Sequence, residues 1–244
     1  MGTAVVTGAN RGIGLGLVTE LLDAGTDVVA VCRSASHADE LQGLQARFPD
    51  RLALVPGSAD THADIDLLAA QIDDGHRDEG IELLIHNAAT GTAAGHAPAA
   101  TEGPLEDLRL DAVTEVMRVN VGVPLLLTAA LVPHLARGAT VVNVSSDLAS
   151  FGLFSADRRG GYAYSLSKTA LNRATQMLAG DPALTARDIR VVSVHPGSVR
   201  TRMGGPTAPA TPQEAARAIL AALTPTTPTG SFVDASANAA PLPW

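Results

Sequence analysis

The sequence predicts a single-domain α/β fold: a doubly wound parallel sheet of about seven strands with helices on both faces. Three observations support this prediction. Short apolar runs alternate with longer amphipathic segments along the chain, as in folds whose parallel strands are joined by helices. The apolar runs lack strict polar alternation, which is typical of strands buried on both faces. A glycine-rich turn also joins the first apolar run to the first helical segment.

The predicted strands are rich in Val, Ile and Leu; they are Thr3–Thr7, Asp27–Cys32, Leu52–Val55, Ile81–Ile85, Thr140–Val144, Arg190–Val194 and Ser231–Val233. The predicted helices carry apolar residues at helical spacing; they are Gly14–Ala24, His62–Ile72, Leu105–Leu135, Gly161–Ala179 and Pro212–Leu223. The last helix has a standard start signal, because Thr211 is a candidate N-cap, Pro212 follows it and Glu214 stands third. No repeat or linker divides the chain, so we expect residues 1–244 to form one domain.

The composition argues against several classes of protein. With 46% apolar and 17% charged residues, the chain is too apolar for a disordered protein and too polar along its length for a membrane protein. Its net charge of −8 argues against nucleic-acid binding. The single cysteine, Cys32, and the lack of a signal-peptide pattern lead us to expect a cytoplasmic protein. The most apolar window, Val119–Leu135, is expected to be a buried helix rather than a membrane span, because it contains Asn, His and two Pro.

The glycine-rich turn Thr7–Gly14 has the pattern Gly-x₃-Gly-x-Gly, with Gly8, Gly12 and Gly14. Glycines allow positive φ and a close approach of the backbone to a pyrophosphate, while the following helix offers free N–H groups. A purely structural tight turn is the alternative. The position between the first strand and the first helix favours a dinucleotide site of the Rossmann type.

Arginine, rather than an acidic residue, follows the second strand. Arg33 stands where an acidic side chain would bind the adenosine ribose of NAD, and Arg11 lies within the glycine turn. A planar guanidinium matches the oxygens of a 2′-phosphate. We therefore expect NADP(H) as the cofactor; two solvated surface arginines are the alternative.

A candidate catalytic group follows the fifth strand. Ser146 ends this strand, and Tyr164 and Lys168 lie four residues apart, on one face of the predicted helix. A neighbouring ammonium favours the phenolate and lowers the tyrosine pKa, so that the hydroxyl can exchange a proton. Chance placement on a surface helix is the alternative, but Lys168 is the only lysine of the chain. Ser145 is the second candidate serine.

These motifs resemble those of the short-chain dehydrogenase/reductase family, and the resemblance extends over essentially the whole chain. It rests on Thr7–Gly14, on Tyr164-x₃-Lys168 and on Ser146, and it includes Asn87-Ala88-Ala89, Asn120 and the run from Pro196 to Thr201. The segments Gly161–Lys168 and His195–Gly205 and the terminal Leu-Pro-Trp are most similar to the carbonyl-reductase-like, sniffer-related branch.

The resemblance implies NADPH-dependent reduction of a ketone or aldehyde to an alcohol, or the reverse. Tyr164 would be the general acid, Ser146 would orient the carbonyl, Lys168 would hold the nicotinamide ribose, and Asn120 would anchor a water of the proton relay. The implied cofactor-binding residues are Gly8, Asn10, Arg11, Gly12, Ile13, Gly14, Arg33, Ser58, Asn87, Ala88, Tyr164, Lys168, Pro196, Gly197, Val199 and Thr201. A homodimer or homotetramer is also implied.

The sequence departs from the family pattern at two cofactor positions. His86-Asn87-Ala88-Ala89 replaces the usual Asn-Asn-Ala-Gly, and the Asp expected after the third strand is replaced by Gly57 or Ser58, with Asp60 further on. After the fifth strand, Phe151, Leu153 and Phe154 either line an apolar substrate pocket or pack a loop against the sheet. A redox-neutral or enoyl-reducing enzyme of this fold, or a catalytically silent NADP(H)-sensing protein, stays an alternative function.

Overall fold

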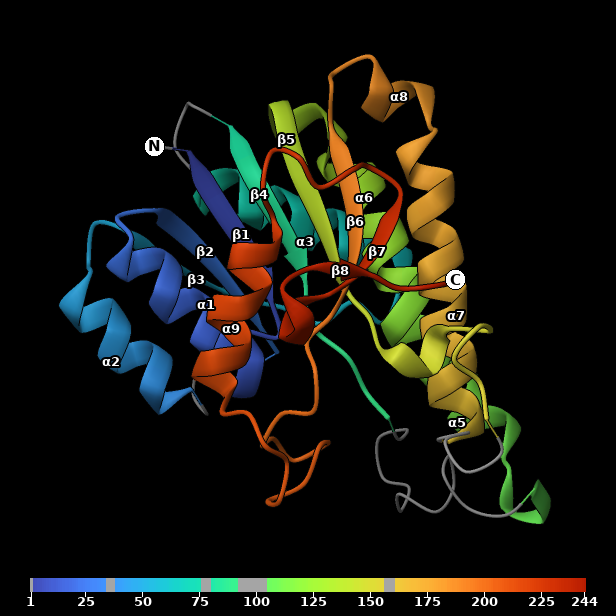
Figure 1. Cartoon of the computed structure of the whole chain (residues 1–244). Helices are drawn as coiled ribbons and strands as arrows, with labels where there is room; N and C mark the ends of the chain where they lie inside the picture. The colour runs from blue at the N-terminus through green and yellow to red at the C-terminus, as the bar shows by residue number, and fades with distance from the viewer. Residues whose placement is uncertain (1, 34–37, 76–79, 92–104, 156–160) are drawn as a thin grey trace.

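The computed structural model describes residues 2–33, 38–75, 80–91, 105–155 and 161–244 and contains one eight-stranded sheet (Figure 1). The strand order is β3-β2-β1-β4-β5-β6-β7-β8. All neighbouring strands are parallel except β7 and β8, which are antiparallel. The order reverses between β1 and β4, and in open α/β sheets this switch point is where ligands bind, beyond the carboxyl ends of the strands.

The strands are β1 (Thr3–Thr7), β2 (Asp27–Cys32), β3 (Leu52–Pro56), β4 (Ile81–His86), β5 (Leu135–Val144), β6 (Arg190–His195), β7 (Ser231–Asp234) and β8 (Ala240–Pro241). The α-helices are α1 (Gly12–Asp23), α2 (Asp39–Arg47), α3 (His62–Gly75), α5 (Leu110–Met117), α6 (Val123–Leu131), α7 (Tyr162–Ala179), α8 (Pro182–Thr185) and α9 (Pro212–Ala222). Short turns of other helix types include η2 (Leu105–Asp107), the π-turn η3 (Arg118–Gly122), η4 (Val132–His134), η5 (Asp147–Ala149) and η7 (Ala235–Ala237).

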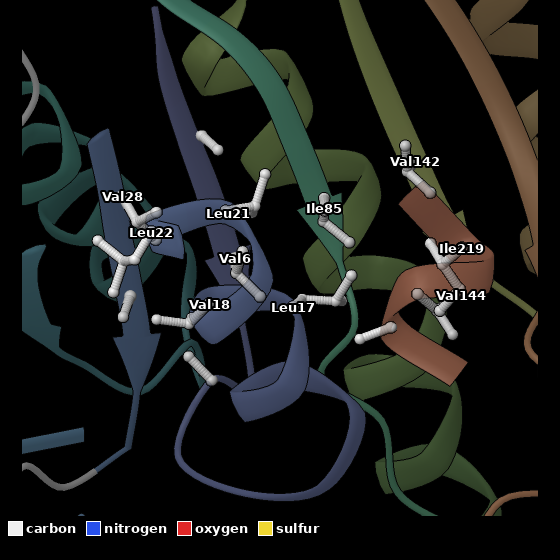
Figure 2. Packing of buried hydrophobic residues seen from close by; sticks show 14 of the residues in the cluster. Val6, Leu17, Val18, Leu21, Leu22, Val28, Ile85, Val142, Val144 and Ile219 are labelled. Atoms are coloured by element: carbon white, nitrogen blue, oxygen red, sulfur yellow. The ribbon is translucent and has the colours of Figure 1, made fainter. Parts of the chain in front are cut away.

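The hydrophobic core forms two layers, one on each face of the sheet. Successive residues of a strand point to opposite faces, so Val6 packs with α1, α2 and α9, whereas Val5 packs with α3 and α6. Figure 2 shows the first layer, in which Leu17 of α1 lies by β1 and β4, and Ile219 of α9 lies by Val142 and Val144 of β5. Burial on both faces explains why the strands are continuous apolar runs without strict alternation.

The predicted fold class and all seven predicted strands are confirmed, and the structure adds the two-residue β8 at the edge of the sheet. The helix α2 was not predicted, because only Leu41 and Leu44 of its nine residues are buried and its apolar stripe is weak.

The expectation of one helix over Leu105–Leu135 is wrong. Its first residues form the separate turn η2, α5 begins at Leu110, the π-turn η3 shifts the helical register, and Leu135 already belongs to β5. The expectation that the window Val119–Leu135 is buried is also wrong in part, because Leu125 and Leu126 are 38% and 40% exposed. By length and composition Leu110–His134 could cross a membrane, and 33% of its most apolar window is buried.

Candidate active site

The glycine turn leads directly into an uncapped helix end. Gly8 and Gly12 have φ values of +65° and +55°, a backbone conformation that favours glycine. Arg11, the N-cap residue of α1, makes no side-chain capping hydrogen bond, and the first turn of α1 holds no acidic residue. This helix end therefore presents N–H groups and the positive end of the helix dipole, which suits a pyrophosphate. The predicted Asn10, Ile13 and Gly14 also lie in this turn and the start of α1.

Asn87, just after β4, holds the glycine turn in place. Its side-chain amide donates to the carbonyl oxygens of Thr7 (3.0 Å) and Gly8 (3.2 Å). The Thr7 hydroxyl accepts from the N–H groups of Asn87 and Ala88, both at 3.1 Å. A Cβ atom on Gly14 would lie 2.3 Å from the Gly8 carbonyl oxygen, so the packing leaves no room for a side chain there. The predicted contact residues Asn87 and Ala88 are thus next to the glycine turn.

Two other arginines, Arg33 and Arg202, lie close enough to Arg11 for their charges to act on it. The pKa of Arg11 is lowered, first by burial and then by the charges of Arg202 and Arg33. Such a concentration of positive charge is unfavourable by itself and favours an anion between the side chains. Arg11 and Arg33 were predicted, but Arg202 was missed. Arg202 directly follows the predicted cofactor residue Thr201, but no motif of the sequence marked it.

The segment after β6 closes over the glycine turn. A Cβ atom on Gly12 would lie 3.3 Å from Cγ2 of Thr201, so the two segments are in contact. Gly197 has a φ of +80°, and Val199 forms an isolated bridge with Ala210, just before α9. Thr201, the last of the predicted cofactor residues in this segment, therefore lies against the glycine turn.

Asp60 is not free to take the place of the family's adenine-binding aspartate. Its carboxylate forms an ion pair of 2.8 Å with Arg118. The predicted Ser58 is exposed in the loop after β3, and the N–H of Gly57 donates to the Cys32 carbonyl at 2.9 Å. This loop therefore starts beside the end of β2, next to Arg33.

Tyr164 and Lys168 lie on one face of α7, as predicted. The Lys168 Nζ is 5.7 Å from the centroid of the Tyr164 ring and donates to the Val144 carbonyl at 2.7 Å. Lys168 is only 3% exposed, and this burial lowers its pKa to about 8. The ammonium group is therefore held beside the Tyr164 ring and against the carbonyl of Val144, which lies two residues before Ser146 in the chain.

The two candidate serines have different environments. Ser145 is 2% exposed and donates to Oδ1 of Asn172 at 2.7 Å, within the packing between β5 and α7. Ser146 stands at the carboxyl end of the sheet as the N-cap of η5, where its hydroxyl accepts from Leu148 N–H (3.2 Å) and donates to Asp147 (3.3 Å). The geometry thus favours Ser146, because Ser145 is engaged inside the fold.

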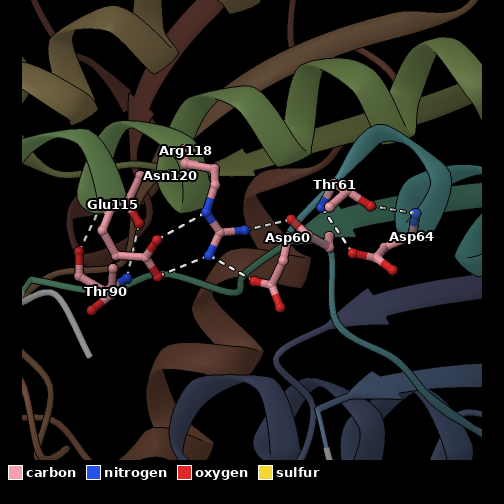
Figure 3. A network of polar contacts seen from close by, with 8 residues as sticks. Asp60, Thr61, Asp64, Thr90, Glu115, Arg118 and Asn120 are labelled. Atoms are coloured by element: carbon pink, nitrogen blue, oxygen red, sulfur yellow. Dashed lines mark hydrogen bonds and ion pairs between the residues drawn. The ribbon is translucent and has the colours of Figure 1, made fainter. Parts of the chain in front are cut away.

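Asn120 lies within the π-turn η3 and is fully buried. Its Oδ1 accepts from the Thr90 N–H, and its Nδ2 donates to the Thr90 carbonyl, both at 2.8 Å (Figure 3). The same Nδ2 donates to Ser167 Oγ at 2.9 Å, and the Ser167 hydroxyl donates to the Tyr164 carbonyl at 2.7 Å. Asn120 therefore connects the loop after β4 to the helical turn that carries Tyr164.

Comparison with known proteins agrees with this geometry. The model of the short chain dehydrogenase family matches residues 2–211. The chain belongs to the short-chain dehydrogenase family. As a family member it is an oxidoreductase, and the tyrosine, lysine and serine occupy the positions described above.

Curated relatives are about 30% identical to this family member over the aligned residues. It is 30% identical over 202 residues to a rhamnolipid-biosynthesis 3-oxoacyl-(acyl-carrier-protein) reductase of Pseudomonas aeruginosa, covering 82% of this chain and 73% of the relative. It is 32% identical over 214 residues to dehydrogenase/reductase SDR family member 4 of Oryctolagus cuniculus, covering 81% and 70%.

Solved structures match over nearly the full length. A carbonyl reductase from chicken fatty liver, solved with NADPH bound, has 30% identity and a TM-score of 0.86, with 99% of this chain and 98% of that chain covered. The carbonyl reductase Sniffer of D. melanogaster has the same identity and TM-score, with both chains fully covered. The predicted resemblance to the carbonyl-reductase-like branch is therefore confirmed.

One departure from the pattern of this family, at His86, has a structural explanation. His86, which replaces an asparagine, is 3% exposed, and its Nε2 lies 2.8 Å from Thr128 Oγ1 of α6. Burial lowers the His86 pKa to about 3, so the ring is neutral and belongs to the core.

Phe151 and Phe154 are 80% and 69% exposed, so they do not pack the loop against the sheet in this chain.

Proposed function

We propose that this protein is an NADP(H)-dependent carbonyl reductase that reduces a ketone or aldehyde to an alcohol, or catalyses the reverse. One observation carries the proposal: the buried Lys168 places its ammonium beside Tyr164, at the same edge of the sheet as Ser146. This arrangement supplies a proton donor and a hydrogen-bond donor to one carbonyl oxygen.

The described residues fit NADP(H). The uncapped N-terminus of α1 suits the pyrophosphate, and the group of Arg11, Arg33 and Arg202 suits a 2′-phosphate. Asn87 and Ala88, together with the segment from Pro196 to Thr201, would line the rest of the cofactor. Several relatives were solved with NADPH or NADP bound, which supports this choice. When bound, the cofactor supplies or accepts the hydride.

Tyr164 gives its phenolic proton to the carbonyl oxygen during reduction and takes it back during oxidation. Ser146 donates a hydrogen bond to the same oxygen, which requires its hydroxyl to turn from Asp147 toward the substrate. The charge of Lys168 favours the phenolate form of Tyr164, and its remaining N–H groups are donors for the nicotinamide ribose. Asn120 anchors a water molecule of the relay that resupplies the proton to Tyr164.

The direct experiment is NADPH consumption with a panel of aldehydes, ketones and quinones. We expect turnover of at least one class with NADPH, weaker turnover with NADH, and loss of both in Tyr164→Phe. Tight NADPH binding without turnover on a broad panel would instead favour the silent cofactor-sensing alternative. Turnover that is equal in wild type and Tyr164→Phe would contradict the mechanism.

We further propose a homodimer or homotetramer, formed through the apolar face of α5 and α6. Leu110 is 83% exposed, and Leu125 and Leu126 are each more than a third exposed, a grouping along one helical stretch that favours burial against another chain. Light scattering after gel filtration tests this, with a monomer as the contradicting result.

The cytoplasmic location stays a proposal that cell fractionation tests.

A further inference from the structure

Arg118 begins the π-turn η3, and four hydrogen bonds and ion pairs hold its guanidinium (Figure 3). Its Nε and one Nη donate to the two carboxylate oxygens of Glu115, both at 2.8 Å. The same guanidinium binds Asp60 Oδ1 at 2.8 Å and donates to the Ala59 carbonyl. The hydrogen bonds that Arg118 donates to Glu115 are the largest cause that raises the pKa of Arg118. Only a planar group with several donors fits these acceptors together.

The segment that Arg118 binds borders the proposed adenosine end of the cofactor site. Gly57 begins this segment, and its N–H is bonded to the last residue of β2, next to Arg33. At its far end, Thr61 and Asp64 form reciprocal hydrogen bonds of 2.8 and 3.2 Å at the start of α3 (Figure 3). These bonds stiffen the segment. Arg118 therefore contacts a segment that hydrogen bonds fix at both ends.

Two residues further on, the π-turn is attached to the catalytic side. Residues two apart in a helix point to different sides, and Asn120 points to Thr90 and Ser167, away from Asp60. A π-turn in an α-helix is rare and is retained where specific contacts hold it. Here Arg118 supplies the contact on one side and Asn120 the contact on the other.

We propose that Arg118 is a positioning residue for the reaction: by fixing the π-turn to Ala59 and Asp60, it sets the place of Asn120, and through Ser167 that of Tyr164. Through Asn120 and Ser167, it thereby links the segment beside the proposed adenosine site to α7, the helix that bears Tyr164. This inference rests on the proposed function for its effect on turnover, but its effect on the Asn120–Thr90 contact is independent of that function.

The first test measures hydrogen exchange of the Thr90 amide, which donates to Asn120. Arg118→Met removes the fork but keeps an unbranched side chain, and Arg118→Lys keeps only the charge. We expect the Thr90 amide to exchange at least about tenfold faster in both variants, because the contact opens more often. The matched control is Arg109→Met, which removes an exposed arginine that pairs with Asp111 close to the start of α5. In this control the Thr90 amide should exchange as fast as in wild type. Unchanged exchange in folded Arg118→Met and Arg118→Lys overturns the proposal.

The second test compares turnover in a double-variant cycle. We expect Arg118→Lys to lower kcat by about tenfold with little change in the KM of the carbonyl substrate, because alignment rather than substrate contact is lost. Since Arg118 acts through Asn120, Arg118→Lys should add little to Asn120→Ala, and the double variant should resemble Asn120→Ala. Fully additive effects on kcat would contradict the proposal. If wild type turns over no carbonyl, the proposed function fails, whereas the exchange test still decides the role of Arg118.

Discussion

Replacing Lys168, the only lysine, should make the free energy of unfolding less dependent on pH in the alkaline range. Burial lowers the pKa of Lys168 from 10.5 to about 8, and about 1.4 kcal/mol corresponds to each pKa unit. The folded state therefore bears a cost of about 3 kcal/mol at neutral pH for keeping this amine charged. Because the unfolded chain binds the proton more tightly, the free energy of unfolding rises with pH between about 8 and 10.5.

Lys168→Met removes this pH dependence but also leaves the Val144 carbonyl without its donor. An unpaired buried carbonyl costs about 1–3 kcal/mol, so the two effects nearly cancel at pH 7, and the variant should have nearly the stability of wild type there. Between pH 7.5 and pH 10.5 the wild type should then gain about 3 kcal/mol relative to the variant. Activity should be lost at every pH, because the ammonium beside Tyr164 is gone.

Urea unfolding of both proteins at several pH values from 7 to 10.5 measures this difference. All other titrating groups are common to the two proteins, so their contributions cancel in the comparison. Because the chain has one lysine, isotope-labelled lysine also reports the pKa directly by NMR. A stability difference that stays constant with pH, or a lysine pKa near 10.5, would refute the reasoning.

Three further predictions concern single side chains. His86 has a pKa of about 3 in the fold against 6.5 ordinarily, so wild type should lose stability as the pH falls below about 6.5. His86→Asn should lose about 2 kcal/mol less by pH 5. Urea unfolding at pH 7 and pH 5 measures both losses, and equal losses in the two proteins would contradict the prediction. Arg33→Ala should weaken NADPH binding by about 2 kcal/mol and leave NADH binding nearly unchanged; fluorescence titration checks both, and an equal loss for the two cofactors would exclude a 2′-phosphate contact. Ser146→Ala should lower kcat by about 10²-fold, whereas Ser145→Ala should chiefly lower the thermal midpoint; the reverse pattern in kinetics and melting would exchange the roles of the two serines.

Most strands could be predicted to within a residue at each end because their apolar runs are buried on both faces, whereas β5 begins at Leu135, five residues before the predicted start. The bounds of β1 and β2 agree at both ends. The π-turn η3 could not be predicted in this way, because tertiary contacts of Arg118 and Asn120 hold it and leave no mark in the local pattern. The short helix α2 was missed because its local pattern is mostly polar. Only two buried leucines attach it to the rest of the fold.

The candidate site could be predicted where residues of the required chemistry also stand at a characteristic spacing. The four-residue spacing of Tyr164 and Lys168 indicated the pair, and the glycine spacing indicated the cofactor turn. Arg202 and Arg118 have no such local signal, since each becomes relevant only when a distant segment is brought beside it. The choice between Ser145 and Ser146 likewise depends on which hydroxyl a buried asparagine engages.

The role of Tyr164 as proton donor can be measured most directly in a single turnover with NADPH already bound. We expect Tyr164→Phe to bind NADPH as tightly as wild type and to oxidise it with a carbonyl substrate about 10²–10⁴-fold more slowly. An unchanged single-turnover rate, with NADPH binding intact, would show that the phenol takes no part in the chemistry.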